Sequence, residues 1–163
     1  MQMNSIIRGD NLDVLAKLNE IGTRFDLILT DPPYNVGKDF GNNTDKQTTS
    51  EYEATIRRCA NKGQYLLSDT GAMLMFCSQR YIYETMRVFA TSATQLNYRR
   101  LMMWHYKNGM SRQTNSPVTE FEPLLWYTKD SEKWTYNGDD VRVPYRSERV
   151  KNPVYKMNKA GER

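Results

Sequence analysis

A short apolar run that stops at a pair of prolines constrains the fold of this chain more than any other feature. Residues 25–34 read Phe-Asp-Leu-Ile-Leu-Thr-Asp-Pro-Pro-Tyr, and the run at 27–29 has the length and character of a buried parallel strand. Neither proline can donate a ladder hydrogen bond, so the strand has to end near Asp31. Ligands of open α/β sheets bind outside the carboxyl ends of such strands. The pattern therefore predicts a site at Asp31.

The residues after this run are suited to hold a planar amine. An ionised Asp31 only accepts hydrogen bonds, and the carbonyl of Pro32 is a second acceptor held by the fixed proline φ. Together they match the two donors of an NH2 group, while Tyr34 offers a flat face for a base. An amine held this way loses conjugation with its ring and becomes a nucleophile. The alternative is that Asp-Pro-Pro-Tyr only ends a strand, since short motifs also occur by chance.

The composition fits one soluble domain that could meet a polyanion. The chain has 163 residues, of which 26% are charged and 12% aromatic, and its net charge is +4. Cys59 and Cys77 have no metal-ligand spacing and His105 is the only histidine, so we expect no metal site, disulfide or histidine-centred triad. There is no secretory leader and no apolar run that could span a bilayer, which predicts a cytoplasmic protein without membrane contact.

Strands and helices are expected to alternate in the first ninety residues, which is typical of an α/β fold with a parallel sheet. Asn11 is the expected cap of the first helix, whose apolar residues recur at helical spacing. The expected strands lie near residues 4–9, 25–30 and 71–77, and the later helices at about 51–67 and 79–91. Two aromatic-rich segments, 98–106 and 121–128, then predict an antiparallel hairpin at the sheet edge.

The polar stretches carry candidate contacts to a nucleic acid. In the loop after Tyr34, Lys38 could meet a phosphate and Phe40 could cover a base, although a solvated loop without contacts is the alternative. The tail from residue 129 is basic with interleaved tyrosines, as in a DNA-facing segment or a disordered one. The candidate nucleic-acid-binding residues are Lys38, Phe40, Trp104, Lys107, Arg142 and Arg146.

These motifs resemble those of the β-class of S-adenosylmethionine-dependent DNA amino-methyltransferases. Asp31, Pro32, Pro33 and Tyr34 resemble motif IV of that family, and Gly-Asp-Asn-Leu at 9–12 resembles motif III. Glu-Pro-Leu-Leu-Trp at 122–126 matches the outline of the family's last strands, but Phe121 stands where members often have His. The alternative for Asp10 is that it only begins a helix, because the helix dipole favours a carboxylate at that end.

The resemblance implies an α/β, Rossmann-like methyltransferase sheet, mainly parallel with an antiparallel edge hairpin. It implies methyl transfer from S-adenosylmethionine to the exocyclic amine of a flipped adenine in DNA, with catalytic residues 31–34. The implied cofactor-binding residues are Asp10, Asn11 and Asp31. Adenine is preferred to cytosine because cytosine-N4 members more often have Ser at the position of Asp31. Trp104 is the candidate for a second aromatic face beside the base.

One expected motif is missing. None of the nine glycines forms the Gly-x-Gly turn that cradles the cofactor in the family. The resemblance therefore implies an incomplete sheet, with a catalytic-motif portion at 1–128, a tail at 129–163, and a complementary chain or second copy that supplies the cofactor half. The open alternatives are an inactive nucleic-acid-binding or regulatory module, or a methyltransferase acting on cytosine N4, RNA or protein glutamine.

Overall fold

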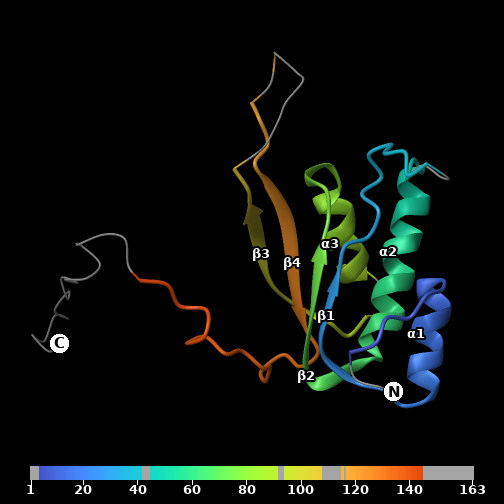
Figure 1. Ribbon diagram of the computed structural model, residues 1–163, viewed down its shortest axis with the longest axis vertical. Helices are drawn as coiled ribbons and strands as arrows, with labels where there is room; N and C mark the ends of the chain where they lie inside the picture. Colours follow the sequence, from blue (N-terminus) through green and yellow to red (C-terminus); the bar gives the residue numbers. More distant parts are fainter. Residues whose placement is uncertain (1–3, 42–44, 92–93, 108–114, 116, 145–163) are drawn as a thin grey trace, which may run out of the picture.

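The computed structural model describes residues 4–41, 45–91, 94–107, 115 and 117–144. The strands form a single mixed sheet, and helices connect or precede them (Figure 1). In chain order they are α1 (Asn11–Glu20), β1 (Phe25–Thr30), α2 (Thr49–Gln64), β2 (Leu67–Phe76), the 3₁₀ turn η1 (Gln79–Tyr81), α3 (Ile82–Thr91), β3 (Asn97–His105) and β4 (Phe121–Thr128).

The sheet has the order β1-β2-β4-β3. β1 and β2 run parallel, whereas β4 is antiparallel to both β2 and β3. The predicted α/β class and the predicted edge hairpin are thus confirmed, with β3 and β4 close to the expected limits. Among the described residues the parallel part is limited to the β1–β2 pair, because residues 4–9 do not join the sheet.

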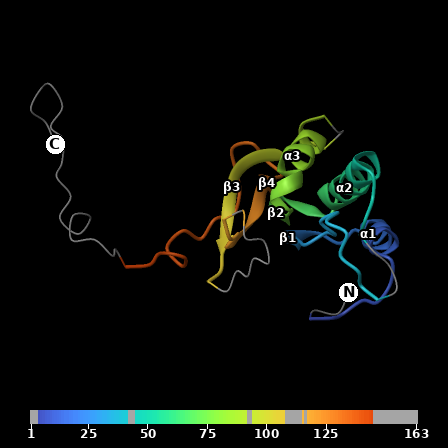
Figure 2. The same cartoon turned by 90° about the horizontal axis from the view of Figure 1, so that it is seen from above.

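The core lies on one face of the sheet. Figure 2 shows α1, α2 and α3 on the same side, with the segment after β4 on the other side. Apolar positions of α2 and α3, such as Ile56 and Val88, are fully buried against Met75 and Leu125 of the sheet. The Thr48 side chain accepts a hydrogen bond from the Glu51 N–H and so caps α2, which begins slightly earlier than predicted and ends at Gln64.

Three expectations about the first thirty residues are wrong. Residues 4–9 form no strand, because they make no ladder with β1. Asp10, rather than Asn11, caps α1, since its carboxylate accepts from the N–H groups of Leu12 and Asp13. β1 is parallel as predicted but is not buried. Leu27 and Leu29 are 54% and 60% exposed, because β1 is an edge strand and no described element covers their face of the sheet at β1.

The segment after β4 packs against the end of the sheet where β2 begins. The backbone N–H groups of Lys129 and Thr135 donate to carbonyls of Gly71 and Thr70. The Arg99 guanidinium lies 4.0 Å from the centre of the Trp134 ring. The boundary at residues 128 and 129 stays a prediction, and residues 145–163 lie outside the described part of the chain. No helix in the described segments has both the length and the apolarity that a membrane crossing requires.

Candidate active site

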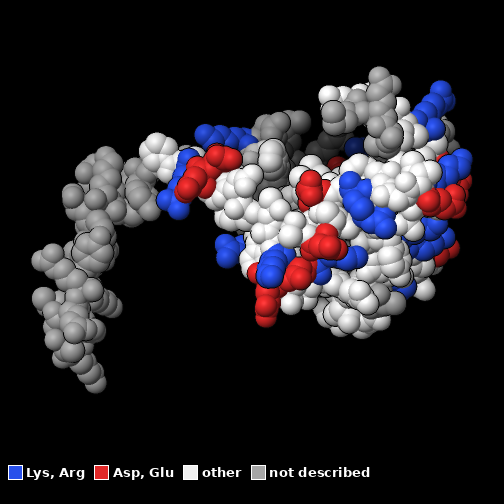
Figure 3. All heavy atoms as spheres, turned by 90° about the horizontal axis from the view of Figure 1, so that it is seen from below, with Lys and Arg blue, Asp and Glu red and all other residues white. Residues whose placement is uncertain are grey.

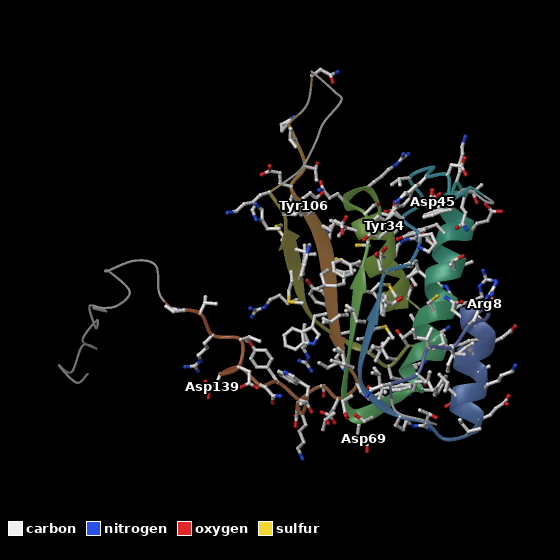
Figure 4. All side chains as sticks on the ribbon, in the orientation of Figure 1. Arg8, Tyr34, Asp45, Asp69, Tyr106 and Asp139 are labelled. Atoms are coloured by element: carbon white, nitrogen blue, oxygen red, sulfur yellow. The ribbon has the colours of Figure 1, made fainter. Side chains whose placement is uncertain are left out.

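Asp31 and the residues after it follow the end of β1, and Figure 4 places Tyr34 at the upper end of the sheet. The chain leaves the strand through the two prolines, with Pro32 buried and Asp31 and Pro33 exposed. Asn35 then takes a left-handed conformation with φ of 57°, which Asn tolerates better than most residues. This turn directs the chain away from β1 and leaves the Asp31 carboxylate accessible.

The Tyr34 hydroxyl lies between two carboxylates. It donates a hydrogen bond to Oε2 of Glu122 at 3.4 Å, across 88 positions of sequence. Burial, a hydrogen bond to Asp31 and the negative charges of Asp31 and Glu122 all raise the pKa of Tyr34 well above its ordinary value. The phenol therefore stays protonated, so it acts as a donor and its ring remains a neutral stacking surface.

A cavity of about 260 Å³ opens at this turn. Its walls combine the acceptor Asp31 and the ring of Tyr34 with two residues of the following loop, Lys38 and Phe40. The Lys38 ammonium lies 5.3 Å from the centre of the Phe40 ring, and the Phe40 side chain is 55% exposed. The cavity is lined by Asp31, Pro32, Pro33, Tyr34, Val36, Lys38, Phe40 and Asp45.

Asp45 organises the loop that bounds the cavity, and the sequence analysis missed it. Its side chain is buried and accepts hydrogen bonds from the backbone N–H groups of Val36 at 3.2 Å and Lys38 at 2.6 Å. Asn35 makes a similar bond, because its Oδ1 accepts from the Gln47 N–H at 2.6 Å. An acidic residue in a polar loop has no periodic signal, so only the tertiary structure reveals this role.

Trp104 lies near the same end of the sheet. It is the cross-strand partner of Glu122, the residue that binds the Tyr34 hydroxyl. Trp104 is 61% exposed, and its ring packs at a right angle to the ring of Phe76, with the ring centres 6.4 Å apart. Lys107 follows shortly after β3 and is exposed, beside Tyr106, which Figure 4 places at the same end of the sheet as Tyr34.

The expected cofactor residues lie on the α1 side of this edge. Gly9 and Asn11, which flank Asp10, line a cavity of about 290 Å³ together with Thr30, the residue before Asp31. Both capping bonds of Asp10 use the same oxygen, Oδ1. Gly9, Asn11 and Thr30 fit one wall of a site for an adenosine-containing cofactor, whereas Asp10 lines a separate cavity along α1. The sequence offers no Gly-x-Gly turn for the opposite wall.

The tail residues are not gathered at this site. Asp139 lies to the side of the sheet, near its lower end in Figure 4, and Arg142 forms an exposed ion pair with it at 2.9 Å. Figure 3 views that lower end, where acidic and basic side chains are interspersed. The predicted contact residue Arg146 lies outside the described residues.

Two curated relatives align with most of the chain. The type II methyltransferase M.HpaI of Haemophilus parainfluenzae is 27% identical over 153 residues, which cover 94% of this chain and 48% of M.HpaI. The DNA adenine methyltransferase YhdJ of Escherichia coli K12 is 26% identical over 143 residues, which cover 87% of this chain and 47% of YhdJ. The chain thus spans about half the length of the curated relatives it matches.

A solved structure and a protein-family model also match this chain. The crystal structure of the M1.HpyAVI–SAM complex matches with a TM-score of 0.61 and 23% identity, covering 86% of this chain and 60% of that one. At this identity the likeness shows the fold alone, and it confirms the predicted Rossmann-like methyltransferase sheet. The model of the DNA methylase family, which groups N6 and N4 methyltransferases, matches residues 25–162. Because that match covers most of the sequence, this chain belongs to the DNA methylase family.

Proposed function

We propose that this chain carries the target-base pocket of a DNA adenine-N6 methyltransferase. The observation that supports this most is the cavity lined by Asp31, Pro32 and Tyr34 at the carboxyl end of β1, with Lys38 and Phe40 on its rim. A base inside a duplex keeps its amine out of reach, so the adenine has to be extruded into such a pocket. The naming of YhdJ as a DNA adenine methyltransferase favours adenine over cytosine.

The roles of the residues follow from their chemistry. The Asp31 carboxylate and the Pro32 carbonyl accept the two amine hydrogens, which turns the nitrogen lone pair out of conjugation. The ring of Tyr34 stacks on the base. Catalysis comes chiefly from alignment of the amine and from the negative charge of Asp31, which stabilises the positive charge that develops on nitrogen. No strong base is needed, because the methylated cationic amine releases its proton readily.

S-Adenosylmethionine, when bound, supplies the transferred methyl group on a sulfonium centre that leaves as a neutral thioether. Asp10, Asn11 and Asp31 are the residues of this chain that would hold it; Asn11 lines the cavity beside β1, and Asp10 and Asp31 lie next to residues that line it, Gly9 and Thr30. In the same proposal, Trp104 gives a second aromatic face to the pocket. The cationic residues proposed to contact DNA phosphates are Lys38, Lys107, Arg142 and Arg146.

The proposal includes a partner at the outer edge of β1. That edge has no strand beside it in the described part of the chain, and it carries the exposed side chains of Leu27 and Leu29. Proteins usually cover such edges, because they invite pairing and aggregation. A complementary chain, or a second copy, would add strands there and supply the glycine-rich cofactor turn. A cytoplasmic location belongs to the same proposal, because the substrate is DNA and Cys59 and Cys77 are free thiols.

Transfer of a tritiated methyl group to DNA tests the function. The chain is assayed with S-adenosylmethionine, alone and with candidate complementary chains. We expect transfer only in a completed enzyme, and we expect Asp31→Ala to abolish it. Asp69→Ala is the matched control, since Asp69 is an exposed acid at the opposite end of the sheet (Figure 4). Full activity of Asp31→Ala would overturn the mechanism, and DNA binding without transfer in every combination would favour a non-catalytic module.

A further inference from the structure

Glu122 reaches the candidate active site from a different part of the sheet. It is the second residue of the interior strand β4, where it pairs with Trp104 of β3, and the ladder to β2 begins two residues later at Leu124. Its Oε2 lies 3.4 Å from the Tyr34 hydroxyl, and both side chains are half-buried. The buried Pro123 follows it and restricts the backbone at this point. The carboxylate of Glu122 is therefore carried by a rigid interior element.

Tyr34 has weaker local support. It follows two prolines on a turn beyond the edge strand β1, and it precedes a residue in the left-handed region, Asn35. An aromatic side chain on such a turn can adopt more than one rotamer, whereas stacking on a base needs one ring plane. A tether from an interior strand removes this freedom before the base arrives, so less ordering has to occur on binding.

We propose that Glu122 is a positioning residue, whose carboxylate holds the Tyr34 hydroxyl and thereby fixes the ring face on which the extruded base stacks. This inference rests on the function proposed above for the same pocket. Trp104 is the cross-strand partner of Glu122, so the tether also sets the spacing between Tyr34 and the second candidate aromatic face. The residue adds no chemistry of its own to the methyl transfer.

The electrostatics of the pocket favour a lasting tether. Two carboxylates, Asp31 and Glu122, face one phenol, and both raise the pKa of that phenol. The hydroxyl therefore keeps its single hydrogen, which Glu122 accepts at 3.4 Å and which the Asp31 carboxylate also attracts. A hydrogen bond to an ionised acceptor is stronger than one between neutral groups. Asp31 remains accessible to the amine, because it is exposed at the end of β1.

The first test does not depend on enzyme activity. The 163-residue chain is prepared with ¹³C-labelled tyrosine, and NMR measures the rotamer averaging of Tyr34, whose signal is assigned with Tyr34→Phe. We expect one rotamer in the wild type and in Glu122→Gln, which keeps an acceptor, but averaging in Glu122→Ala. Glu120→Ala is the matched control, since this exposed acid lies two positions earlier and faces His105 instead.

A second measurement covers the case in which Glu122→Ala does not fold. Tyr34→Phe keeps the ring and removes only the hydroxyl, so the ring at position 34, labelled with ¹³C-phenylalanine, should show the same averaging. An equally ordered ring in folded Glu122→Ala, or in Tyr34→Phe, would overturn the inference. Averaging in both variants would support it even if the completed enzyme showed no methyl transfer, so the two proposals can fail separately.

A double-mutant cycle in the completed enzyme then connects the tether with base binding. Glu122→Ala should weaken binding of DNA with an extrudable target base about 3- to 10-fold, raising KM more than it lowers kcat. Glu122→Gln should restore most of this loss. In the Tyr34→Phe background the Glu122→Ala change should have no further effect, because the tether is already gone. Additive effects of the two substitutions would show that Glu122 acts independently of Tyr34.

Discussion

Asp31 and Tyr34 have separate tasks in the proposed pocket, although they are only three positions apart. Asp31 is exposed and offers its carboxylate to an amine, whereas Tyr34 is half-buried and held through its hydroxyl by Glu122. Hydrogen bonding to the amine depends on the Asp31 carboxylate, and stacking depends on the Tyr34 ring, although the two side chains also hydrogen-bond to each other. Substitutions at the two positions should differ in kind, with Asp31 affecting the chemical step and Tyr34 affecting occupancy of the pocket.

Tyr34→Ala should weaken binding of an extruded base by about 1–3 kcal/mol, which is the usual loss when a stacking aromatic side chain is removed. Tyr34→Phe keeps the ring and should lose less. Fluorescence of 2-aminopurine at the target position measures extrusion in the completed enzyme, and equilibrium titration measures affinity. Tyr65→Ala is a suitable control, because Tyr65 is an exposed tyrosine that follows the end of α2. Equal binding by wild type and Tyr34→Ala would contradict the stacking role.

Asp31 and Tyr34 could be predicted from the sequence, because they belong to one motif of four consecutive residues whose side chains indicate its chemistry. Glu122 was noted only as part of a family outline, since a hydrogen bond across 88 positions leaves no local trace. Asp45 was missed for a similar reason. Its carboxylate accepts hydrogen bonds from the backbone N–H groups of Val36 and Lys38, and such bonds require no particular sequence pattern. The roles of the tail cations Arg142 and Arg146 stay predictions, because no described contact joins the tail to the pocket.

The loop that follows Tyr34 depends on Asp45 for its shape. Asp45→Ala would leave the N–H groups of Val36 and Lys38 without their acceptor, and should destabilise the loop by about 1–3 kcal/mol. We expect faster amide hydrogen exchange at these two residues and weaker DNA binding in the completed enzyme. Asp45→Asn keeps one acceptor and should have a smaller effect.

Asp39→Ala provides the matched control for this loop. Asp39 is exposed and accepts only from the N–H of Gly41, at 2.8 Å among the described contacts. Its removal should leave the exchange of Val36 and Lys38 unchanged. Unchanged exchange at those amides in Asp45→Ala as well would show that the loop is organised by other contacts.

Strand predictions succeeded where pairing partners lie within the chain. β2, β3 and β4 have such partners, and all three lie close to their expected positions. The strand expected at residues 4–9 does not form, because a short apolar segment is stable as a strand only when it pairs with another strand. β1 was expected to be buried because of its apolar run. Such a run indicates that the strand is suited to burial, but it does not say which element covers it. The exposure of Leu27 and Leu29 therefore agrees with the partner proposed for this side of β1.

At the scale of the whole molecule, the described sheet carries the proposed base pocket but only one wall of the proposed cofactor site. Gly9 and Asn11 line a cavity with Thr30 at the end of β1, and no strand in the described part of the chain pairs with the outer edge of β1. The chain spans about half the length of M.HpaI and YhdJ. Affinity for the base and affinity for the cofactor should therefore be separable, with the first encoded largely in this chain.

The 163-residue chain by itself should bind S-adenosylmethionine weakly or not at all. The reason is that the sequence contains no Gly-x-Gly turn, so no backbone cradle faces the wall formed by Gly9 and Asn11. Isothermal titration calorimetry measures this directly, and binding should appear once a chain with the glycine-rich turn pairs with β1. Leu29→Lys should prevent that restoration, because it places a charge on the exposed apolar face beside the pairing edge, whereas Ile6→Lys, at a fully exposed position, should not. Tight binding by the monomeric chain would show that the cofactor site is complete within it, and the proposal of a complementary partner would then be abandoned.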